Sequence, residues 1–448
     1  MSVHHASGRS TQRFKPYQAY KDSGVEWLGE IPTHWQVKRL KFVAPVSEQR
    51  AAVPEGDLPY VALEHIESGT GKLMASVGPS PAENGTSIFR PGDVLFGKLR
   101  PYLAKVLRAD FAGTCSTELL VLRSNRDIDP AHLAYQMLSS GFIRWIDSMT
   151  YGTKMPRANP EQVANTRVVI PPKSDQAAIV AFLDRETAKV DVLVAKKERV
   201  IELLHEKRSA LITQSVTKGL YPDIPMKDSG IEWLGEIPAH WEVKKLKAVA
   251  SLQTGITLGK RYETGPLEVR PYLRVANVQD GYLDLDNITE IELPRAEARR
   301  YELRVGDVLM TEGGDFDKLG RGEVWDGQIQ GCLHQNHIFA VRPIHAEVHP
   351  RFLATIMGSS YGRAYFTATS KQSTNLASTN STKLKNLPVA LPEADEQEEI
   401  LRFITSEAGR LDVMIGRIQD GIGRLREFRG ALISAAVMGR IDVREESA

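Results

Sequence analysis

Residues 21–41 read K-D-S-G-V-E-W-L-G-E-I-P-T-H-W-Q-V-K-R-L-K, and residues 227–247 read K-D-S-G-I-E-W-L-G-E-I-P-A-H-W-E-V-K-K-L-K. Of these 21 positions, 17 are identical, including both members of the pairs Trp27/Trp233 and Trp35/Trp241. A match of this length does not arise by chance, so the chain is a tandem duplication. Two similar halves in one chain suggest a partner or substrate that also comes in two halves.

The two halves stay alignable beyond this opening match. Residues 59–69 correspond to 271–281, and both segments alternate apolar and polar residues and end at glycine, which predicts a strand followed by a turn. Residues 92–95 and 306–309 share the sequence G-D-V-L, again a turn and then a strand. From Tyr151 onward the offset between the halves is constant, so that Thr153 meets Thr374. Each half therefore begins with a mixed α/β globular unit.

After the prolines at 171 and 392 the apolar residues recur every seven positions, which is typical of a coiled-coil seam. Caps precede each run near residues 174 and 395, and glycines 219 and 439 follow the ends. Leu193, Val200, Met414, Ile415 and Ile422 are expected to widen the stripe. The predicted seam consists of Leu183, Val190, Leu204 and Leu211 in the first helix, with Lys197 in register, and of Ile404, Leu411, Ile418, Leu425 and Leu432 in the second.

Two matched long helices in one chain can bury their stripes on each other. We therefore predict an α+β chain in which two globular domains are separated by an antiparallel coiled coil with pseudo-twofold symmetry. The alternative is that each helix packs only on its own domain. The predicted order is a mobile arm at 1–19, a first domain at 20–173, a long helix at 174–219, a linker at 220–226, a second domain at 227–394, a second long helix at 395–440 and a tail at 441–448.

Composition places the chain among globular proteins of the cytoplasm. No stretch approaches the length of a membrane span, and the segment from Met1 to Tyr20 lacks the apolar core of a signal peptide. The only two cysteines, Cys115 and Cys332, are expected to be small buried residues and not a disulfide. The net charge of +1 means that binding to DNA would need a local basic surface or a partner that shares the contact.

Catalytic and metal-binding patterns are absent or incomplete. The segment 255–261 has one residue too few for a phosphate-binding loop, and Arg261 stands where Ser or Thr is required. Cys332, His334 and His337 could lie close together, but no second pair completes a metal site. We find no protease, hydrolase or methyltransferase motif. These observations favour a chain that binds and does not react.

Two stretches in each half have the composition of a recognition surface, because basic, amide and hydroxyl side chains can contact base edges and phosphates. The framework is shared between the halves while these loops differ, as two readers of different short sequences would require. A locked turn and a solvated polar loop are the respective alternatives. The candidates are Lys98, Arg100, Tyr102, Lys105, Thr153, Lys154, Arg157 and Asn159 in the first half, and Lys318, Arg321, Lys371, Gln372, Ser373, Thr374, Asn375 and Asn380 in the second.

The arrangement resembles the specificity subunit of type I restriction-modification systems over about residues 20–440. The resemblance is carried by the repeated S-G-x-E-W-L-G-x-I-P-x-H-W, by G-D-V-L-F-G-K-L-R-P-Y at 92–102, and by the segments 171–176 and 392–397 that lead into the long helices. It implies that each domain reads one half of a split double-stranded DNA site, while the helices set the spacing and dock two modification subunits.

The resemblance also implies which chemistry lies elsewhere. The modification (methyltransferase) subunits would use S-adenosylmethionine, and separate restriction subunits would use ATP and Mg²⁺ for translocation and cleavage. This chain would then hold no cofactor and no metal and would have no catalytic residue. Two other hypotheses remain at this stage: a coiled-coil scaffold with two protein-binding domains and no DNA contact, and an enzyme with an unrecognised active site, such as a nuclease.

Overall fold

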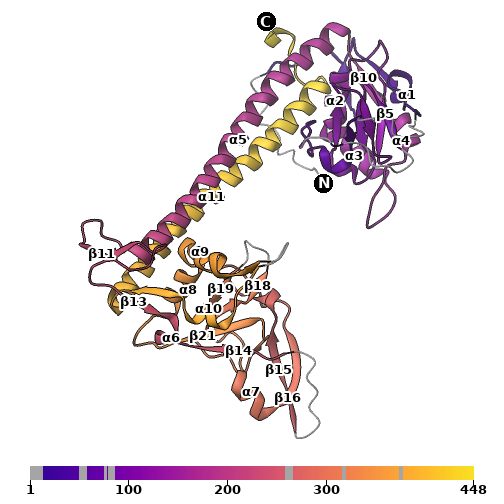
Figure 1. Cartoon of the computed structure of the whole chain (residues 1–448). Helices are drawn as coiled ribbons and strands as arrows, with labels where there is room; N and C mark the ends of the chain where they lie inside the picture. The colour runs from indigo at the N-terminus through magenta and orange to yellow at the C-terminus, as the bar shows by residue number, and fades with distance from the viewer. Residues whose placement is uncertain are drawn as a thin grey trace, which may run out of the picture. The chain divides into compact units, whose positions relative to one another are not determined.

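The computed structural model describes residues 14–49, 58–74, 78, 86–257, 266–314, 319–372 and 377–447 (Figure 1). Its contacts divide the chain into two compact units. Unit 1 contains Met1–Glu198 together with Ile418–Ala448, and unit 2 contains Arg199–Arg417. Each unit thus combines one copy of the duplicated domain with segments of both long helices, so the units of structure differ from the sequence repeats.

Domain 1, the globular part of unit 1, mixes short strands and short helices. Its helices are α1 (Leu40–Val43), α2 (Pro130–Leu138), α3 (Ser140–Ser148) and α4 (Pro160–Asn165), with 3-10 turns η1 (Leu63–His65) and η2 (Pro101–Leu103). Its strands are β1 (Tyr20–Asp22), β2 (Glu30–Pro32), β3 (Gln36–Arg39), β4 (Tyr60–Val61), β5 (Ser87–Phe89), β6 (Val94–Gly97), β7 (Val106–Arg108), β8 (Gly113–Cys115), β9 (Leu119–Leu122) and β10 (Arg167–Ile170).

Two small sheets form the centre of domain 1: β7-β6-β9 is antiparallel, whereas β4-β8-β5 is mixed because β4 and β8 are parallel. Strand β6 lies between β7 and β9, and β8 lies between β4 and β5. Strand β6 is buried along its whole length, because its G-D-V-L-F-G sequence has apolar residues on both faces. Helices α2 and α3 pack on this sheet through Met137 and Phe142, whose ring meets Phe96 edge to face at 5.8 Å.

Domain 2, the globular part of unit 2, repeats this plan with longer strands. Its helices are α6 (Leu246–Val249), α7 (Arg295–Tyr301), α8 (Pro350–Gly358), α9 (Ser360–Thr369) and α10 (Ser381–Lys385), with η3 (Val275–Asn277). Its strands are β11 (Met226–Asp228), β12 (Glu236–Pro238), β13 (Glu242–Lys245), β14 (Ala250–Thr254), β15 (Leu267–Leu273), β16 (Thr289–Pro294), β17 (Val308–Thr311), β18 (Gly313–Gly314), β19 (Gly322–Val324), β20 (Leu333–His334), β21 (Ile338–Pro343), β22 (Lys371–Gln372), β23 (Ala377–Ser378) and β24 (Pro388–Leu391).

The sheets of domain 2 correspond to those of domain 1. The second G-D-V-L segment forms β17 at the centre of the sheet β14-β21-β17-β19. The pair β13–β24 matches the pair β3–β10, and both are antiparallel. The hydrophobic core of domain 2 includes Met310, Phe339, Phe352 and Phe366. The predicted duplication and the α+β class are thereby confirmed.

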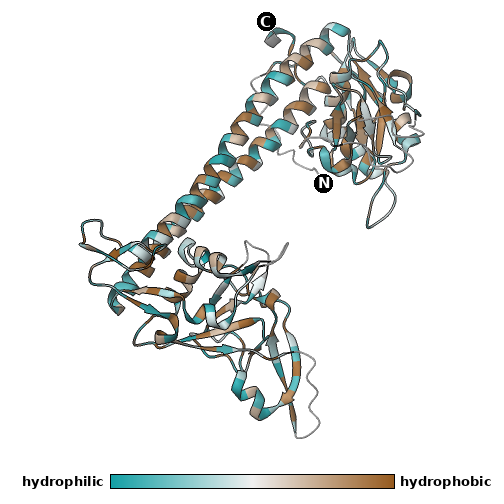
Figure 2. Cartoon of the chain, viewed as in Figure 1, coloured by the Kyte–Doolittle hydropathy of each residue, from teal (hydrophilic) through white to brown (hydrophobic). Residues whose placement is uncertain are grey.

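Two long helices cross the unit boundary. Helix α5 extends over Lys173–Lys218 and α11 over Ala394–Val437, 46 and 44 residues. In unit 1 the beginning of α5, with Phe182 and Leu183, shares a core with Leu432 and Ile433 near the end of α11. In unit 2 it is the end of α5, at Val216, that shares a core with the beginning of α11. The pairing is therefore antiparallel, and Figure 2 shows apolar residues recurring along both helices.

The flanks of the predicted seam differ from the prediction. Every seam position of α5 and α11 is buried or half-buried, and Ile415 and Ile422 join the buried face at 6% exposure each. Leu193, Val200 and Met414, expected to widen the stripe, are 43%, 43% and 48% exposed. The reason is geometric: a two-helix contact buries a narrow stripe, and these residues lie outside it.

The duplicated H-W dipeptide joins each domain to both long helices. In unit 1 the carboxylate of Asp175, in the first turn of α5, accepts from Trp35 Nε1 at 3.1 Å and lies 2.8 Å from His34 Nε2. In unit 2, Glu396 in the first turn of α11 meets the matching Trp241 and His240 at 3.1 and 2.8 Å. An acidic group also suits the positive end of a helix.

In unit 1 the end of α11 packs against the same H-W segment of domain 1. Gly439, just after α11, has φ +69°, and a Cβ added there would lie 2.4 Å from Pro32 and 2.9 Å from Trp35. Tyr20 donates its hydroxyl to the Gly439 carbonyl at 3.0 Å. The motif at 21–41 therefore holds the start of α5 and the end of α11 together, which gives the repeated tryptophan a physical role that the sequence did not reveal.

The N-terminal arm corrects one expectation. Residues 1–13 lie outside the described part, but two aromatic residues of the predicted mobile arm, Phe14 and Tyr17, are packed. Tyr17 is 4% exposed, and the rings of Phe14 and Phe182 meet edge to face at 5.3 Å. The amide of Asp442 donates to the Lys15 carbonyl at 2.7 Å, so the tail lies against the arm. Apolar burial by two aromatic rings outweighs the local polarity of the arm.

Candidate nucleic-acid interface

The sequence motifs that both halves share have a structural role in each domain. Asp93 of the first G-D-V-L segment is buried and accepts two hydrogen bonds from Arg123, at 2.9 and 2.8 Å. Asp307 of the second accepts two from Arg342, both at 2.7 Å. The bidentate pairing raises the pKa of the Arg123 guanidinium above its usual value. These aspartates hold two strands together and are not free to bind a ligand.

The glutamine of the P-P-x-x-x-Q segments has an equally structural position. Gln176 is 1% exposed; its oxygen accepts from the Asp129 amide at 2.6 Å, and its nitrogen donates to the Asp127 and Pro171 carbonyls. Gln397 repeats this set with the His349 amide at 2.8 Å. Each glutamine ties its long helix to the segment that leads into the short helix of its domain, so these repeated residues are occupied by structural hydrogen bonds.

In domain 1 the two predicted recognition stretches lie side by side. We call residues 97–105 and 151–159 loop pair 1. The amide of Arg100 donates to the Pro156 carbonyl at 2.7 Å, and the amide of Ala158 donates to the Lys98 carbonyl at 2.9 Å. Arg157 exchanges backbone hydrogen bonds with Tyr151 at 3.0 and 3.2 Å. Two segments that are distant in the sequence thus form one surface.

The side chains of loop pair 1 present charge and flat apolar surface to solvent. Arg100 stands in a left-handed turn, with φ 49°, before η2, and its side chain is exposed, as is that of Lys154. Tyr102, Tyr151 and Met155 are 50%, 59% and 57% exposed. Exposed aromatic rings beside guanidinium groups suit stacking on bases and contact with phosphates.

In domain 2 the matching segments meet in the same way. We call residues 312–321 and 371–380, in their described parts, loop pair 2. Strand β23 pairs with both β18 and β22, and the amide of Thr379 donates to the Glu312 carbonyl at 2.9 Å. This last bond is the counterpart of the bond from Ala158 to Lys98, since Glu312 aligns with Lys98 when the two halves of the sequence are aligned on their G-D-V-L segments. The backbone geometry is therefore repeated.

The chemistry of the two loop pairs is different on this common backbone. Lys98 is replaced by Glu312, Arg100 by Gly314, and Arg157 by Ser378. Glu312 also accepts from His337 Nδ1 at 2.7 Å when that nitrogen carries the proton. Two surfaces that share a scaffold but not their charges would favour different base sequences.

Some predicted residues have an intramolecular role. The Lys105 amine donates to the carbonyls of Leu63 and Ile66 at 2.7 and 2.8 Å, so it closes η1. Asn159 and Asn380 are the N-caps of α4 and α10. Their capping explains why this asparagine is repeated in both halves.

The other candidates remain predictions. Arg157 pairs with Glu118 at 2.9 Å and Arg321 donates to Gln279 at 3.3 Å, while the side chains of Thr153 and Lys371 are exposed. Lys318, Ser373, Thr374, Asn375 and the side chain of Gln372 lie outside the described residues.

The Cys–His cluster does not form a metal site. His334 is fully buried, with its Nδ1 3.0 Å from the Ile338 carbonyl, whereas His337 faces Glu312. Burial lowers the pKa of His334 to about 4 and raises the pKa of the Cys332 thiol to about 12. Among the described residues no group of three or more His, Cys, Asp or Glu side chains could hold a metal ion. Cys115 and Cys332 are free and buried, as expected.

One structural feature was missed by the sequence reasoning. Arg208 and Arg429 occupy equivalent positions of the two halves, as do Asp191 and Asp412, and each arginine lies beside the aspartate of the opposite helix. The arginines occupy the coiled-coil register one helical turn after Leu204 and Leu425, where an apolar residue is usual. A charged residue repeated at that register was the signal that could have revealed them.

Known proteins share both the sequence pattern and the fold. The family model of the type I restriction modification DNA specificity domain matches twice, at residues 32–203 and 238–412. The EcoKI specificity subunit of Escherichia coli is 24% identical over 329 residues, covering 72% of this chain and 68% of that protein. The StySPI specificity subunit of Salmonella potsdam is 24% identical over 323 residues, covering 71% and 67%.

A solved structure supports the fold independently. A chain from a study of complex assembly and conformational transition of the type I R-M system has a TM-score of 0.62 and 21% identity, covering 91% of this chain and 98% of its own length. In the described part of this chain no helix is long and apolar enough to cross a membrane. With two matches to the DNA specificity domain that together span most of the chain, this protein belongs to the family of type I restriction-modification specificity subunits.

Proposed function

We propose that this chain is the DNA specificity subunit of a type I restriction-modification complex, in which domain 1 and domain 2 each read one half of a split double-stranded DNA site. The observation that carries the proposal is the repeated backbone of the two loop pairs with exchanged side chains. In loop pair 1 the amide of Ala158 donates to the carbonyl of Lys98, and in loop pair 2 the amide of Thr379 donates to the carbonyl of Glu312. The backbone bond is the same, but the side chain beside it is a lysine in one pair and a glutamate in the other.

Loop pair 1 has the groups needed for direct contact with DNA. The guanidinium of Arg100 can bind a phosphate or the O6 and N7 acceptors of guanine through two hydrogen bonds. Lys154 adds a point charge, and Tyr102 and Tyr151 add exposed rings. Loop pair 2 carries an acidic group, which can accept a hydrogen bond from the amino group of cytosine. The two domains would therefore prefer different half-sites.

The balanced charge of the chain indicates that partners share the contact with DNA. A net charge of +1 over 448 residues gives little general attraction to phosphates. We propose that methyltransferase subunits supply the rest and dock on the outer faces of the helices. Val192 and Leu193 are exposed on α5 in unit 1, and their counterparts in the second half, Val413 and Met414, are exposed on α11 in unit 2. Two equivalent apolar faces suit two copies of one partner.

We propose that this chain is not itself an enzyme and holds no cofactor. In a type I complex S-adenosylmethionine would belong to the modification subunits, and ATP and Mg²⁺ to the restriction subunits. Support comes from the motifs of this chain, whose buried acids and glutamines are occupied by structural hydrogen bonds. The cytoplasm, where the genome lies, would be its compartment.

The test is the pattern of genome methylation in cells that carry this chain with a modification subunit, compared with cells that lack the chain. A split motif methylated on both strands and lost with the deletion is expected, and it would give the recognised site directly. Unchanged methylation, with the modification subunit present and active, would contradict the proposal.

A further inference from the structure

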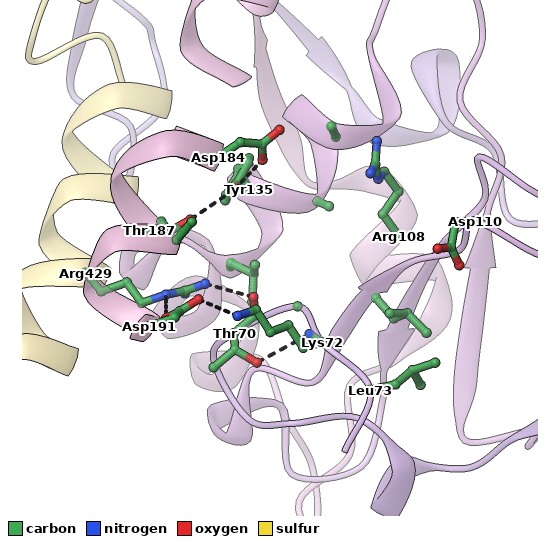
Figure 3. A pocket seen from close by; sticks show the side chains of 16 residues that line it. Thr70, Lys72, Leu73, Arg108, Asp110, Tyr135, Asp184, Thr187, Asp191 and Arg429 are labelled. Atoms are coloured by element: carbon green, nitrogen blue, oxygen red, sulfur yellow. Dashed lines mark hydrogen bonds and ion pairs between the residues drawn. The ribbon is translucent and has the colours of Figure 1, made fainter. Parts of the chain in front are cut away.

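A buried arginine connects the long helices of unit 1 to domain 1. Arg429 extends from α11, and its side chain is 6% exposed. Its Nε donates to Asp191 on α5 at 2.9 Å, and one terminal nitrogen donates to the backbone carbonyl of Thr70 at 3.0 Å (Figure 3). The other terminal nitrogen donates to the backbone carbonyl of Gly69 at 2.9 Å. One guanidinium thus binds α11, α5 and a turn of domain 1 together.

The same turn is held from a second direction. Lys72 Nζ lies 2.6 Å from the other oxygen of Asp191. The Glu67 amide donates to the Lys72 carbonyl at 2.8 Å and closes the turn 67–72. Asp191 therefore receives two cations, one from the opposite helix and one from the domain. The Asp191 side chain is 20% exposed, and this partial burial makes its ion pairs stronger than pairs at the open surface.

From this turn the contacts continue to loop pair 1. The amide of Gly69 donates to the carbonyl of Ala104 at 3.1 Å. Ala104 has φ 48° and ends η2, the 3-10 turn that contains Tyr102 and follows Arg100. Lys105, the next residue, bonds to the carbonyls of Leu63 and Ile66 just before the turn. We call the contacts of Arg429 with Asp191, Gly69 and Thr70 the clamp. Two hydrogen bonds, from Arg429 to Gly69 and from Gly69 to Ala104, connect the clamp to the backbone of loop pair 1.

Unit 2 has the same residues without the clamp. Arg208 Nε lies 3.4 Å from Asp412, and these side chains are 42% and 54% exposed. The matching turn around Gly281 bonds instead within its own domain: Asp280 accepts from Arg363 at 2.7 and 2.6 Å, and the Gly281 amide donates to Gly322. Within the described part of unit 2, no hydrogen bond or ion pair joins residues 279–282 to α5 or α11.

Another helix–domain contact is common to both units, so the difference is specific to the clamp. The Ser140 amide donates to Ser434 of α11 at 3.0 Å, and the Ser360 amide donates to Thr213 of α5 at 3.0 Å. Each domain is therefore attached to its helix at the start of α3 or α9. Both domains also have the contacts of the H-W dipeptide and of the glutamines. Among the described residues, only domain 1 has an additional attachment from the turn 67–72 to both long helices, and an additional, separated attachment restricts rotation of a domain further.

We propose that Arg429 is a positioning residue that fixes loop pair 1 on the helices of unit 1, a link that has no counterpart among the described residues of unit 2. The inference rests on the proposed function and adds an asymmetry to it. Domain 1 reads its half-site from a fixed position, and domain 2 accommodates variation in the gap between the half-sites.

The test uses the full chain in complex with its methyltransferase subunits and compares Arg429→Lys with the matched control Arg208→Lys. Lysine keeps the charge, but its single compact ammonium cannot reproduce the planar fork whose three nitrogens reach Asp191, Gly69 and Thr70 at once. Hydrogen exchange of the Glu67 and Gly69 amides is expected to become roughly 10- to 100-fold faster in Arg429→Lys, from the loss of charge-assisted bonds. Exchange at 279–282 in Arg208→Lys is expected to stay unchanged.

The same variants are then assayed on DNA. The duplexes carry the split site defined by methylation, with the gap as found or one base pair longer or shorter. Arg429→Lys is expected to reduce the preference of the complex for the correct gap about tenfold, in line with the loosened clamp, while Arg208→Lys keeps it. Unchanged exchange at Gly69, an unchanged gap preference, or an equal effect of both variants would overturn the inference. A wild-type complex without any DNA sequence preference would instead refute the proposed function. The hydrogen-exchange measurement would still show whether Arg429 restrains the turn 67–72.

Discussion

At the scale of single residues, the acidic group in the first turn of each long helix decides how firmly a domain is attached. Asp175 has a side chain only 5% exposed and meets both Trp35 and His34. We expect Asp175→Ala to lower the free energy of unfolding by roughly 1.5 to 3 kcal/mol, since it removes hydrogen bonds to a buried charge. Urea denaturation followed by tryptophan fluorescence measures this. Asp395→Ala, an exposed first-turn acid of α11, is the control, and equal losses would contradict the role of Asp175.

A second residue-scale prediction concerns buried histidine. His132 in α2 is fully buried, and burial lowers its pKa to about 4. Above pH 6.5 the imidazole is neutral in both the folded and the unfolded chain. Between pH 6.5 and 4 only the unfolded chain binds the proton, so stability falls as the pH drops, by roughly 1.4 kcal/mol per pH unit in that window.

Substitution separates this effect from the general acid sensitivity of the protein. We expect His132→Leu to flatten the loss of thermal stability between pH 6.5 and 4. The exposed His205 of α5 provides the control, and His205→Leu should leave the slope as it is. Melting temperatures measured across this pH range give the comparison, and a His132→Leu slope equal to that of wild type would refute the assignment.

At the scale of elements, two neighbouring residues of α11 separate stability from assembly. Ile415 is 6% exposed in the seam, and Met414 is 48% exposed beside it. Ile415→Asp places an unpaired charge in the seam and should cost more than about 3 kcal/mol of unfolding free energy. Met414→Asp should leave the helices intact but weaken binding of a methyltransferase subunit. Circular dichroism melts and co-purification distinguish the two, and normal co-purification of Met414→Asp would remove that face from the docking surface.

The elements also show how far sequence reasoning extends. Heptad spacing and caps predicted both long helices, because a period of seven over several turns has one structural solution. The flanks could not be predicted, since whether Leu193 is buried depends on the width of the contact and not on local pattern. Likewise the two recognition stretches were visible as polar loops, but their meeting through Arg100 and Pro156 depends on tertiary contacts between segments distant in sequence.

The roles of single motif residues were hidden for a related reason. The asparagines at 159 and 380 were predicted to contact DNA, and the sequence assigned no role to the G-D-V-L aspartates, because amides and carboxylates serve both ligands and the backbone. Only the fold shows that Asp93 is occupied by Arg123 and that Asn159 caps α4. A repeated polar residue in a duplicated chain is thus more informative about the common frame than about what each half recognises.

At the scale of the whole molecule, a duplicated frame with variable loops makes the two half-sites separable. Replacing residues 97–105 and 151–159 together with those of a relative should change one half of the methylated motif and leave the other half and the gap unchanged. The reason is that the frame contacts of Asp93, Gln176 and Asp175 lie outside the exchanged segments. Both segments must move together, since the amide of Ala158 bonds to the carbonyl of Lys98.

The control for this exchange is to move one segment alone. Exchange of 97–105 without 151–159 mismatches the two halves of one surface and should reduce methylation without giving a new motif. Sequencing of methylated DNA from cells carrying each chimera reads both outcomes. If the paired exchange altered both halves of the motif, the two domains would not read DNA independently, and the repeated loop pairs could not be the two readers.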